Sequence, residues 1–112
     1  MDIDIRDRDK VKVIKLRGKL ALGAPVDDLR QALDDLLVSK QANFLIDLAE
    51  VPMIDSSGIG LLVRLLTSTK EAGGAIKLLS PSKFTLQSLK LVGILPLFEV
   101  YEDRERALAS FQ

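Results

Sequence analysis

The residues best suited to chemistry lie in one stretch, 53–60, which reads Met-Ile-Asp-Ser-Ser-Gly-Ile-Gly. An apolar segment precedes it and an amphipathic one follows, a pattern that predicts a loop between a buried strand and a helix. Such loops carry functional groups in open α/β sheets. The hydroxyl of Ser56 is then expected at the helix N-terminus, where free backbone amides and the helix dipole accommodate a phosphate.

A structural explanation of the same stretch competes with this one. Asp55, Ser56 and Ser57 are all residue types that cap helices, and a cap needs only one of them. Gly58 and Gly60 lower the helix propensity of the first turn by about 1 kcal/mol each, but they leave the backbone accessible to a docking protein. Because the run exceeds what a cap requires, it favours a functional role for these residues.

The helix predicted over residues 57–72 carries apolar residues on more than one side. The inward stripe expected from helical spacing consists of Ile59, Leu62, Val63 and Leu66. Three apolar residues lie beside it: Leu61, Leu65 and Ala72. Either the helix buries a wide surface, or these residues form a partly exposed ridge that a partner covers. In the second case we expect the partner to contact Leu61, Arg64, Leu65 and, in an earlier loop, Leu22 and Gly23.

The composition excludes several classes of function. Sixteen basic residues balance sixteen acidic ones, so the chain lacks the excess positive charge that favours nucleic acid binding. It has no cysteine and no histidine, which removes thiolate chemistry and the imidazole base of ordinary serine hydrolases. A hydrolase built on Ser56 would need Lys70 or Lys77 as its base, and we do not expect an enzyme.

Metal and membrane chemistry are not indicated either. The carboxylates of Asp47, Glu50 and Asp55 lie close in sequence, but no second cluster supports a metal site, and no cofactor is predicted. We expect Asp47 at an exposed strand edge or bonded to a neighbouring loop. The longest apolar segment, 91–98, is far shorter than the ~20 residues that cross a bilayer, and the N-terminal residues lack the pattern of a secretory signal. We therefore expect a cytoplasmic protein without membrane insertion.

Hydrophobic periodicity and turn residues predict the elements that position this stretch. Strands are expected at residues 3–5, 11–16, 44–48, 75–79 and 97–101, with a hairpin turn at 7–10. Helices are expected from Pro25, over 57–72, from a Ser80-Pro81 cap to Gly93, and from Asp103 to Phe111. The order β-β-α-β-α-β-α-β-α predicts one α/β domain over residues 1–112, with a small, mostly parallel mixed sheet.

Over essentially its whole length the sequence resembles the STAS-domain family, especially the bacterial anti-sigma factor antagonists. The most specific element is VPMIDSSGIGLLV at 51–63, supported by EAGGAIKLL at 71–79 and LKLVGI at 89–94. The resemblance implies the STAS fold, with Ser56 as the phosphoacceptor between Asp55 and Ser57. It also implies a serine kinase partner that acts as the anti-sigma factor. In that family the unphosphorylated antagonist binds this kinase and frees sigma, the phosphorylated form lets go, and a metal-dependent serine phosphatase resets it.

One departure and one alternative accompany this resemblance. Many antagonists have an acidic residue and then aspartate in the loop after the second strand, whereas this chain has Gly-Lys-Leu-Ala-Leu-Gly at 18–23, which bears on the choice of kinase. STAS domains also serve as subunits of ABC transporters that move lipids, where they bind the ATPase without phosphorylation. Those subunits commonly carry another residue in the serine pair, so the intact Ser56-Ser57 pair favours the switch.

Overall fold

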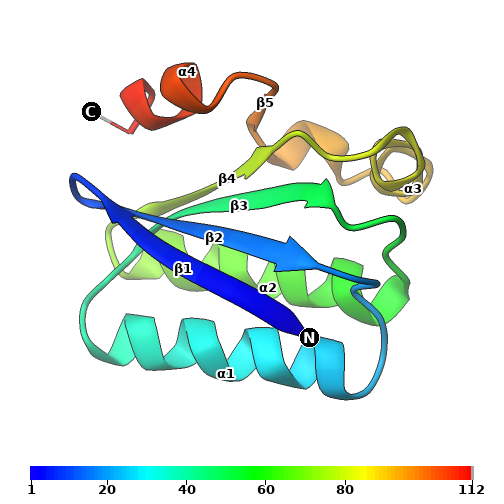
Figure 1. Ribbon diagram of the computed structural model, residues 1–112, viewed down its shortest axis with the longest axis horizontal. Coiled ribbons are helices and arrows are strands. Elements are labelled where there is room, and N and C mark those ends of the chain that lie inside the picture. Colours follow the sequence, from blue (N-terminus) through cyan, green and yellow to red (C-terminus); the bar gives the residue numbers. More distant parts are fainter. Residues whose placement is uncertain (112) are drawn as a thin grey trace.

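The computed structural model describes residues 1–111, and within them a five-stranded sheet carries four α-helices (Figure 1). The strands are β1 (Asp2–Arg8), β2 (Val11–Arg17), β3 (Asn43–Glu50), β4 (Ala75–Leu79) and β5 (Val100–Tyr101). The helices are α1 (Ala24–Val38), α2 (Ser56–Glu71), α3 (Lys83–Leu91) and α4 (Arg104–Ala109), with a 3₁₀ turn, η1 (Leu95–Leu97), before β5. The predicted α/β class and element order are confirmed.

The strands lie in the order β1-β2-β3-β4-β5. β1 is antiparallel to β2, and the other neighbours are parallel, as expected for a mostly parallel mixed sheet. Parallel strands bring their carboxyl ends to the same edge of the sheet. The loop after β2 and the loop after β3 therefore meet, and both lead into helices.

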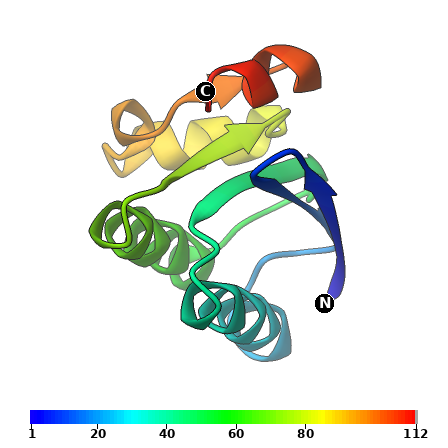
Figure 2. The same ribbon diagram turned by 90° about the vertical axis from the view of Figure 1, so that its left-hand side faces the viewer.

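Two apolar clusters lie on opposite faces of the sheet. The larger one joins the sheet to α1, α2 and α3, and the smaller one lies under α4. β3 contributes to both clusters because successive side chains of a strand point to opposite faces of the sheet. Phe44, Ile46 and Leu48 belong to the larger cluster, and Leu45 belongs to the smaller one. Figure 2 shows α1 and α2 below the sheet and α4 above it.

Two predicted boundaries near the C-terminus were wrong. Ser82, not Ser80, caps α3, since its hydroxyl accepts a hydrogen bond from the Thr85 amide. Ser80 has a φ of 51°, and its amide donates to the Tyr101 carbonyl, which holds it at the end of β4. The last strand is shorter than predicted because Leu97 still belongs to η1 and the Phe98 amide donates to the Leu95 carbonyl, so β5 begins only at Val100.

Candidate functional site

The Asp55 carboxylate joins the two loops at the carboxyl edge of the sheet. One of its oxygens accepts a hydrogen bond from the Gly58 amide in the first turn of α2, and the other accepts one from the Leu22 amide, each at 2.9 Å. These two donors, Leu22 first and Gly58 second, lower the pKa of Asp55 below its ordinary value. Asp55 is therefore the helix cap, and it is held in its anionic form.

Ser56 is the first residue of α2, and its side chain is exposed. Among the hydrogen bonds of residues 1–111, none involves the hydroxyl of Ser56 or that of its half-buried neighbour Ser57. The capping explanation thus applies to Asp55 alone. Ser56 is left at a helix N-terminus, exposed and without a structural partner, which is the position expected for a phosphoacceptor.

The two glycines that follow have different environments. A Cβ atom on Gly58 would lie 2.4 Å from the Leu20 carbonyl oxygen and 2.7 Å from Cγ1 of Ile54, so only glycine allows the loop and the helix to approach this closely. Leu20 and Ile54 also form a parallel β-bridge. A Cβ atom on Gly60 would meet nothing within 4 Å, and Gly60 is exposed. Only Gly60 therefore fits the prediction of open access for a docking protein.

The prediction that Leu61 and Leu65 form an exposed partner-binding ridge was wrong. Leu61 is 5% exposed and Leu65 is 1% exposed, so the alternative of a wide buried surface is the correct one. The buried residues of α2 are Gly58, Leu61, Leu62, Leu65 and Thr69. Of the predicted inward stripe only Leu62 is buried, and Ile59, Val63 and Leu66 are half-buried.

A shallow hollow of about 310 Å³ lies between the start of α1 and the start of α2. It is lined by Leu22, Val26, Arg30, Ser57, Gly60, Leu61 and Arg64. Five of these residues were predicted as members of the site. Gly23, exposed at the N-cap of α1, does not line the hollow, and neither does Ser56, which lies beside it next to Ser57 in the chain.

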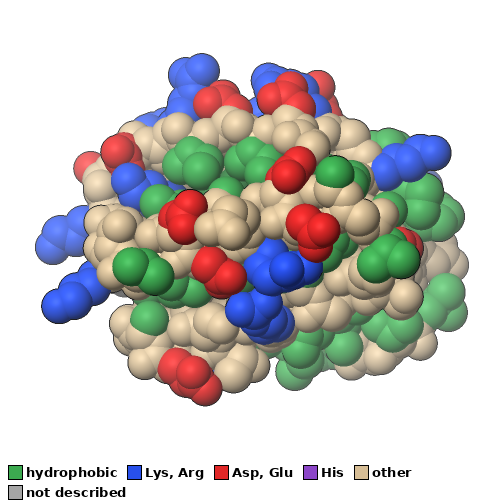
Figure 3. Space-filling view, turned by 90° about the horizontal axis from the view of Figure 1, so that it is seen from below, with side chains coloured by type: hydrophobic (Ala, Val, Ile, Leu, Met, Phe, Trp, Pro, Cys, Tyr) green, Lys and Arg blue, Asp and Glu red, His purple; other side chains and the backbone are tan. Residues whose placement is uncertain are grey.

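The hollow has an apolar residue and two arginines at its surface. Leu22 is 78% exposed, so its side chain is available for contact with a partner. Arg30 pairs with Asp27 at 2.6 Å, and Arg64 pairs with Asp34 across α1 and α2 at 3.5 Å. Figure 3, which views the molecule from this side, shows basic and acidic side chains meeting in the middle. A surface of this kind suits a protein partner better than a small substrate.

Neither lysine considered as a catalytic base can serve Ser56. Lys77 is buried in β4, where its ammonium group donates to the backbone and hydroxyl oxygens of Ser110. Lys70 lies about four turns further along α2, roughly 20 Å from Ser56 at 1.5 Å per residue. The described residues hold no group of three or more potential metal ligands, and none of their helices is long and apolar enough to cross a membrane.

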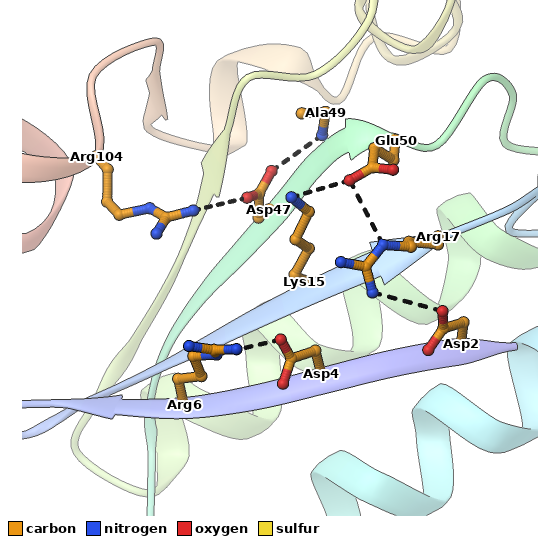
Figure 4. Close-up of polar contacts among 9 residues, drawn as sticks. All are labelled: Asp2, Asp4, Arg6, Lys15, Arg17, Asp47, Ala49, Glu50 and Arg104. Carbon is orange, nitrogen blue, oxygen red and sulfur yellow. Dashed lines mark hydrogen bonds and ion pairs between the residues drawn. The ribbon is translucent and has the colours of Figure 1, made fainter.

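A second group of charged residues, missed from sequence, lies on the opposite face of the sheet (Figure 4). Asp47 is 3% exposed and accepts hydrogen bonds from the Ala49 amide at 3.0 Å and from Arg104 at 3.2 Å. Of the two expectations for Asp47, the exposed strand edge was therefore wrong; the carboxylate is hydrogen-bonded, but to Arg104 at the start of α4 and to Ala49 of its own strand. Nearby, Glu50 pairs with Lys15 at 2.9 Å and with Arg17 at 3.5 Å. The hydrogen bond and positive charge of Lys15 lower the pKa of Glu50 below its ordinary value.

Comparisons with known proteins were made by sequence and by structure. The family model described as the STAS domain matches residues 2–107. A curated protein of Thermotoga neapolitana, provisionally named an anti-sigma factor antagonist, is 28% identical over 79 residues, which is 70% of each chain.

The structural matches extend over nearly the whole chain. The crystal structure of a Thermotoga maritima protein with the same provisional name has a TM-score of 0.90 and 21% identity, and covers 97% of this chain and 93% of its own. Bacillus SpoIIAA in its phosphorylated form has a TM-score of 0.78 and 19% identity, covering 99% and 100%. These matches confirm the predicted fold.

Proposed function

The chain belongs to the STAS-domain family, and we propose on that basis that it is an anti-sigma factor antagonist, a binding protein controlled by phosphorylation of Ser56. In its unphosphorylated form it binds an anti-sigma factor that is also a serine kinase, and so releases a sigma factor. A metal-dependent serine phosphatase restores the unphosphorylated form. The proposed function involves no reaction catalysed by the chain itself, and it places the protein in the cytoplasm.

The observation that carries this proposal is that Asp55 and Ser56 have different roles in the fold. Asp55 alone caps α2 and holds the loop that contains Leu22. The exposed hydroxyl of Ser56 makes no hydrogen bond within residues 1–111, so a kinase can modify it without disturbing the fold. The structure of SpoIIAA in a phosphorylated form supports the idea that this fold tolerates such a modification.

Phosphorylation would change binding through charge. A phosphoserine adds about −1.5 to −2 units of charge at neutral pH, and at Ser56 that charge lies next to the anionic carboxylate of Asp55. The free amides in the first turn of α2 stabilise the phosphate within the protein. A partner that packs against Leu22 and the neighbouring hollow would have to desolvate the dianion, or face it with its own acidic groups, so it dissociates.

The direct test is the intact mass of the protein purified from its native host across growth and stress conditions, followed by peptide mapping of any phosphate. Phosphate on Ser56 supports the switch, and its loss in Ser56→Ala but not in Ser57→Ala assigns it to that hydroxyl. A pool that is unmodified under all conditions would contradict the proposal and favour a STAS subunit of an ABC-type lipid transporter, which binds its ATPase without phosphorylation.

A further inference from the structure

One edge of the sheet is long and uncovered. β1 is the outermost strand beside β2, and its seven residues extend along the whole of β2. Figure 2 shows β1 at the side of the molecule, with no other element beyond it. Among the hydrogen bonds of residues 1–111 outside the strand ladders, none involves the backbone of β1. Such an edge is a template for another strand.

The hairpin determines which backbone groups point outward. Only two residues, Asp9 and Lys10, separate the paired residues Arg8 and Val11, so the backbone groups of Arg8 point toward β2. The direction alternates along an antiparallel strand. The free amides and carbonyls at the edge are therefore those of the odd-numbered residues of β1, which are Ile3, Ile5 and Asp7.

On the face of the sheet that carries α4, the side chains of β1 have opposite charges in the two halves of the strand. Asp2 and Asp4 lie in the first half, and Arg6 and Arg8 in the second, all on the face of the sheet that carries α4. Ile5 lies between them on the other face and is 40% exposed. A strand with this pattern is complementary to itself when it is reversed.

We propose that β1 pairs with β1 of a second copy of this chain, antiparallel and centred on Ile5. In this register Asp4 faces Arg6 of the second copy and Asp2 faces Arg8, so each acidic residue on the α4 face lies opposite a basic one. On the other face Asp7 lies opposite Ile3, and no like charges face each other. The outward groups of Ile3, Ile5 and Asp7 face one another and complete the hydrogen bonds. The two Ile5 side chains cover each other.

Among the registers centred on a residue of β1, only this one both sets opposite charges against each other and brings the outward backbone groups together. A centre at Asp4 or Arg6 sets that charged residue opposite its own copy, and it also brings the wrong backbone groups together. A centre at Ile3 sets Asp2 opposite Asp4, and a centre at Asp7 sets two aspartates opposite each other. Since like charges directly opposite are destabilising, the charges of β1 select the register centred on Ile5.

The charged groups are available for these contacts. Arg6 is 76% exposed and Arg8 is 46% exposed, while Asp2 is 65% exposed. Their present ion pairs are all at the surface, and surface pairs are weak and easily exchanged. The dimer would form one continuous sheet with the two Ser56 sites at opposite ends, because the paired strands run in opposite directions.

Charge exchange tests this register. Sedimentation of the full chain should show a dimer, and Asp4→Arg or Arg6→Asp should each weaken dimerisation by about tenfold or more, because each makes two like-charge contacts. Mixing these two variants should restore association, since the arginine introduced at position 4 then faces the aspartate introduced at position 6. The double variant should again self-associate. A monomeric wild type, or a dimer insensitive to these exchanges, would overturn the proposal.

Matched variants separate this pairing from a general attraction between oppositely charged proteins. Glu71→Arg at the end of α2 and Lys90→Asp near the end of α3 make the same changes in net charge at exposed positions away from β1. Each should dimerise like the wild type, and mixing them should give no new association. Association restored equally in this control mixture would contradict the register.

A cross-link tests the centre of the pairing. Facing Cα atoms in a hydrogen-bonded antiparallel pair are about 5.5 Å apart, a separation that a disulfide can bridge. The chain has no cysteine, so Ile5→Cys introduces one thiol per copy. Mild oxidation should yield a covalent dimer of Ile5→Cys, whereas Val38→Cys, 83% exposed at the end of α1, should remain mostly uncoupled. Equal coupling of the two variants would overturn the proposal.

Discussion

The Asp55 carboxylate accepts a hydrogen bond from the Leu22 amide, 33 positions earlier in the chain, at 2.9 Å. This contact places the loop after β2 against the start of α2, so that exposed Leu22 lines the hollow together with Ser57, next in the chain to exposed Ser56. A residue that resembles an ordinary helix cap therefore also determines the shape of the candidate binding site. Changes at Asp55 should affect the loop as well as the helix.

Replacement of Asp55 by Asn should destabilise the fold in a pH-dependent way. The pKa of Asp55 is lower in the folded protein than its ordinary value of 3.8, so its contribution to stability is fully present above that value. The contribution is lost as the pH falls through the folded-state pKa. Urea unfolding should therefore show a difference between wild type and Asp55→Asn that is largest near neutral pH and shrinks in acid. A difference that grows as the pH falls would contradict this explanation.

The two glycines of α2 should respond oppositely to alanine. A methyl group at Gly58 would lie 2.4 Å from the Leu20 carbonyl oxygen, a backbone atom, and should reduce stability by about 1–3 kcal/mol. Gly60 has no neighbour within 4 Å of the added carbon, so Gly60→Ala should raise stability by about 0.5–1 kcal/mol through helix propensity. Thermal or urea unfolding of the two variants measures both effects. A stable Gly58→Ala protein would show that the loop is not held as closely as the geometry indicates.

Periodicity and turn residues predict the order of elements because each strand and helix is defined by a short, local pattern. The buried face of α2 could not be predicted in this way. Gly58 and Thr69 belong to that face, so a stripe traced through apolar residues alone was displaced from it. The pairing of Asp47 with Arg104 could not be predicted from sequence either, because 57 positions separate the two residues and only the fold brings them together.

Loss of the Arg104 side chain should destabilise the protein through Asp47. The carboxylate of Asp47 is buried, and without Arg104 it keeps, among residues 1–111, only the hydrogen bond from the Ala49 amide. Because Arg104 itself is 46% exposed and solvent screens the pair, Arg104→Ala should cost about 1–2 kcal/mol. Arg106→Ala, on the same helix but paired with Asp103 at the surface, should cost less than about 0.5 kcal/mol. Equal effects in urea unfolding would show that burial of Asp47 is unimportant.

Leu22 should contribute to partner binding without contributing to stability. Its side chain is 78% exposed and lines the hollow beside α2, so truncation removes apolar contact only when a partner is bound. Leu22→Ala should weaken binding to the anti-sigma factor by about tenfold and change the free energy of unfolding by less than about 0.5 kcal/mol. Val38→Ala, equally exposed at the far end of α1, is the control and should leave binding unchanged. Calorimetric titration measures the affinities. If both variants bind with the affinity of the wild type, Leu22 is not part of the interface.

Substitutions at Ser56 should separate binding from release. Ser56→Ala keeps the surface neutral and cannot be phosphorylated, so it should bind the anti-sigma factor constitutively, including in the presence of ATP. Ser56→Asp places a negative charge beside Asp55, at the edge of the proposed docking surface, and should weaken binding by about tenfold or more. Ser57→Asp, half-buried one residue later, tests whether the exact position of the charge matters. If Ser56→Asp binds as tightly as wild type in a titration without ATP, charge at this residue does not cause release, and the switch must act by another route.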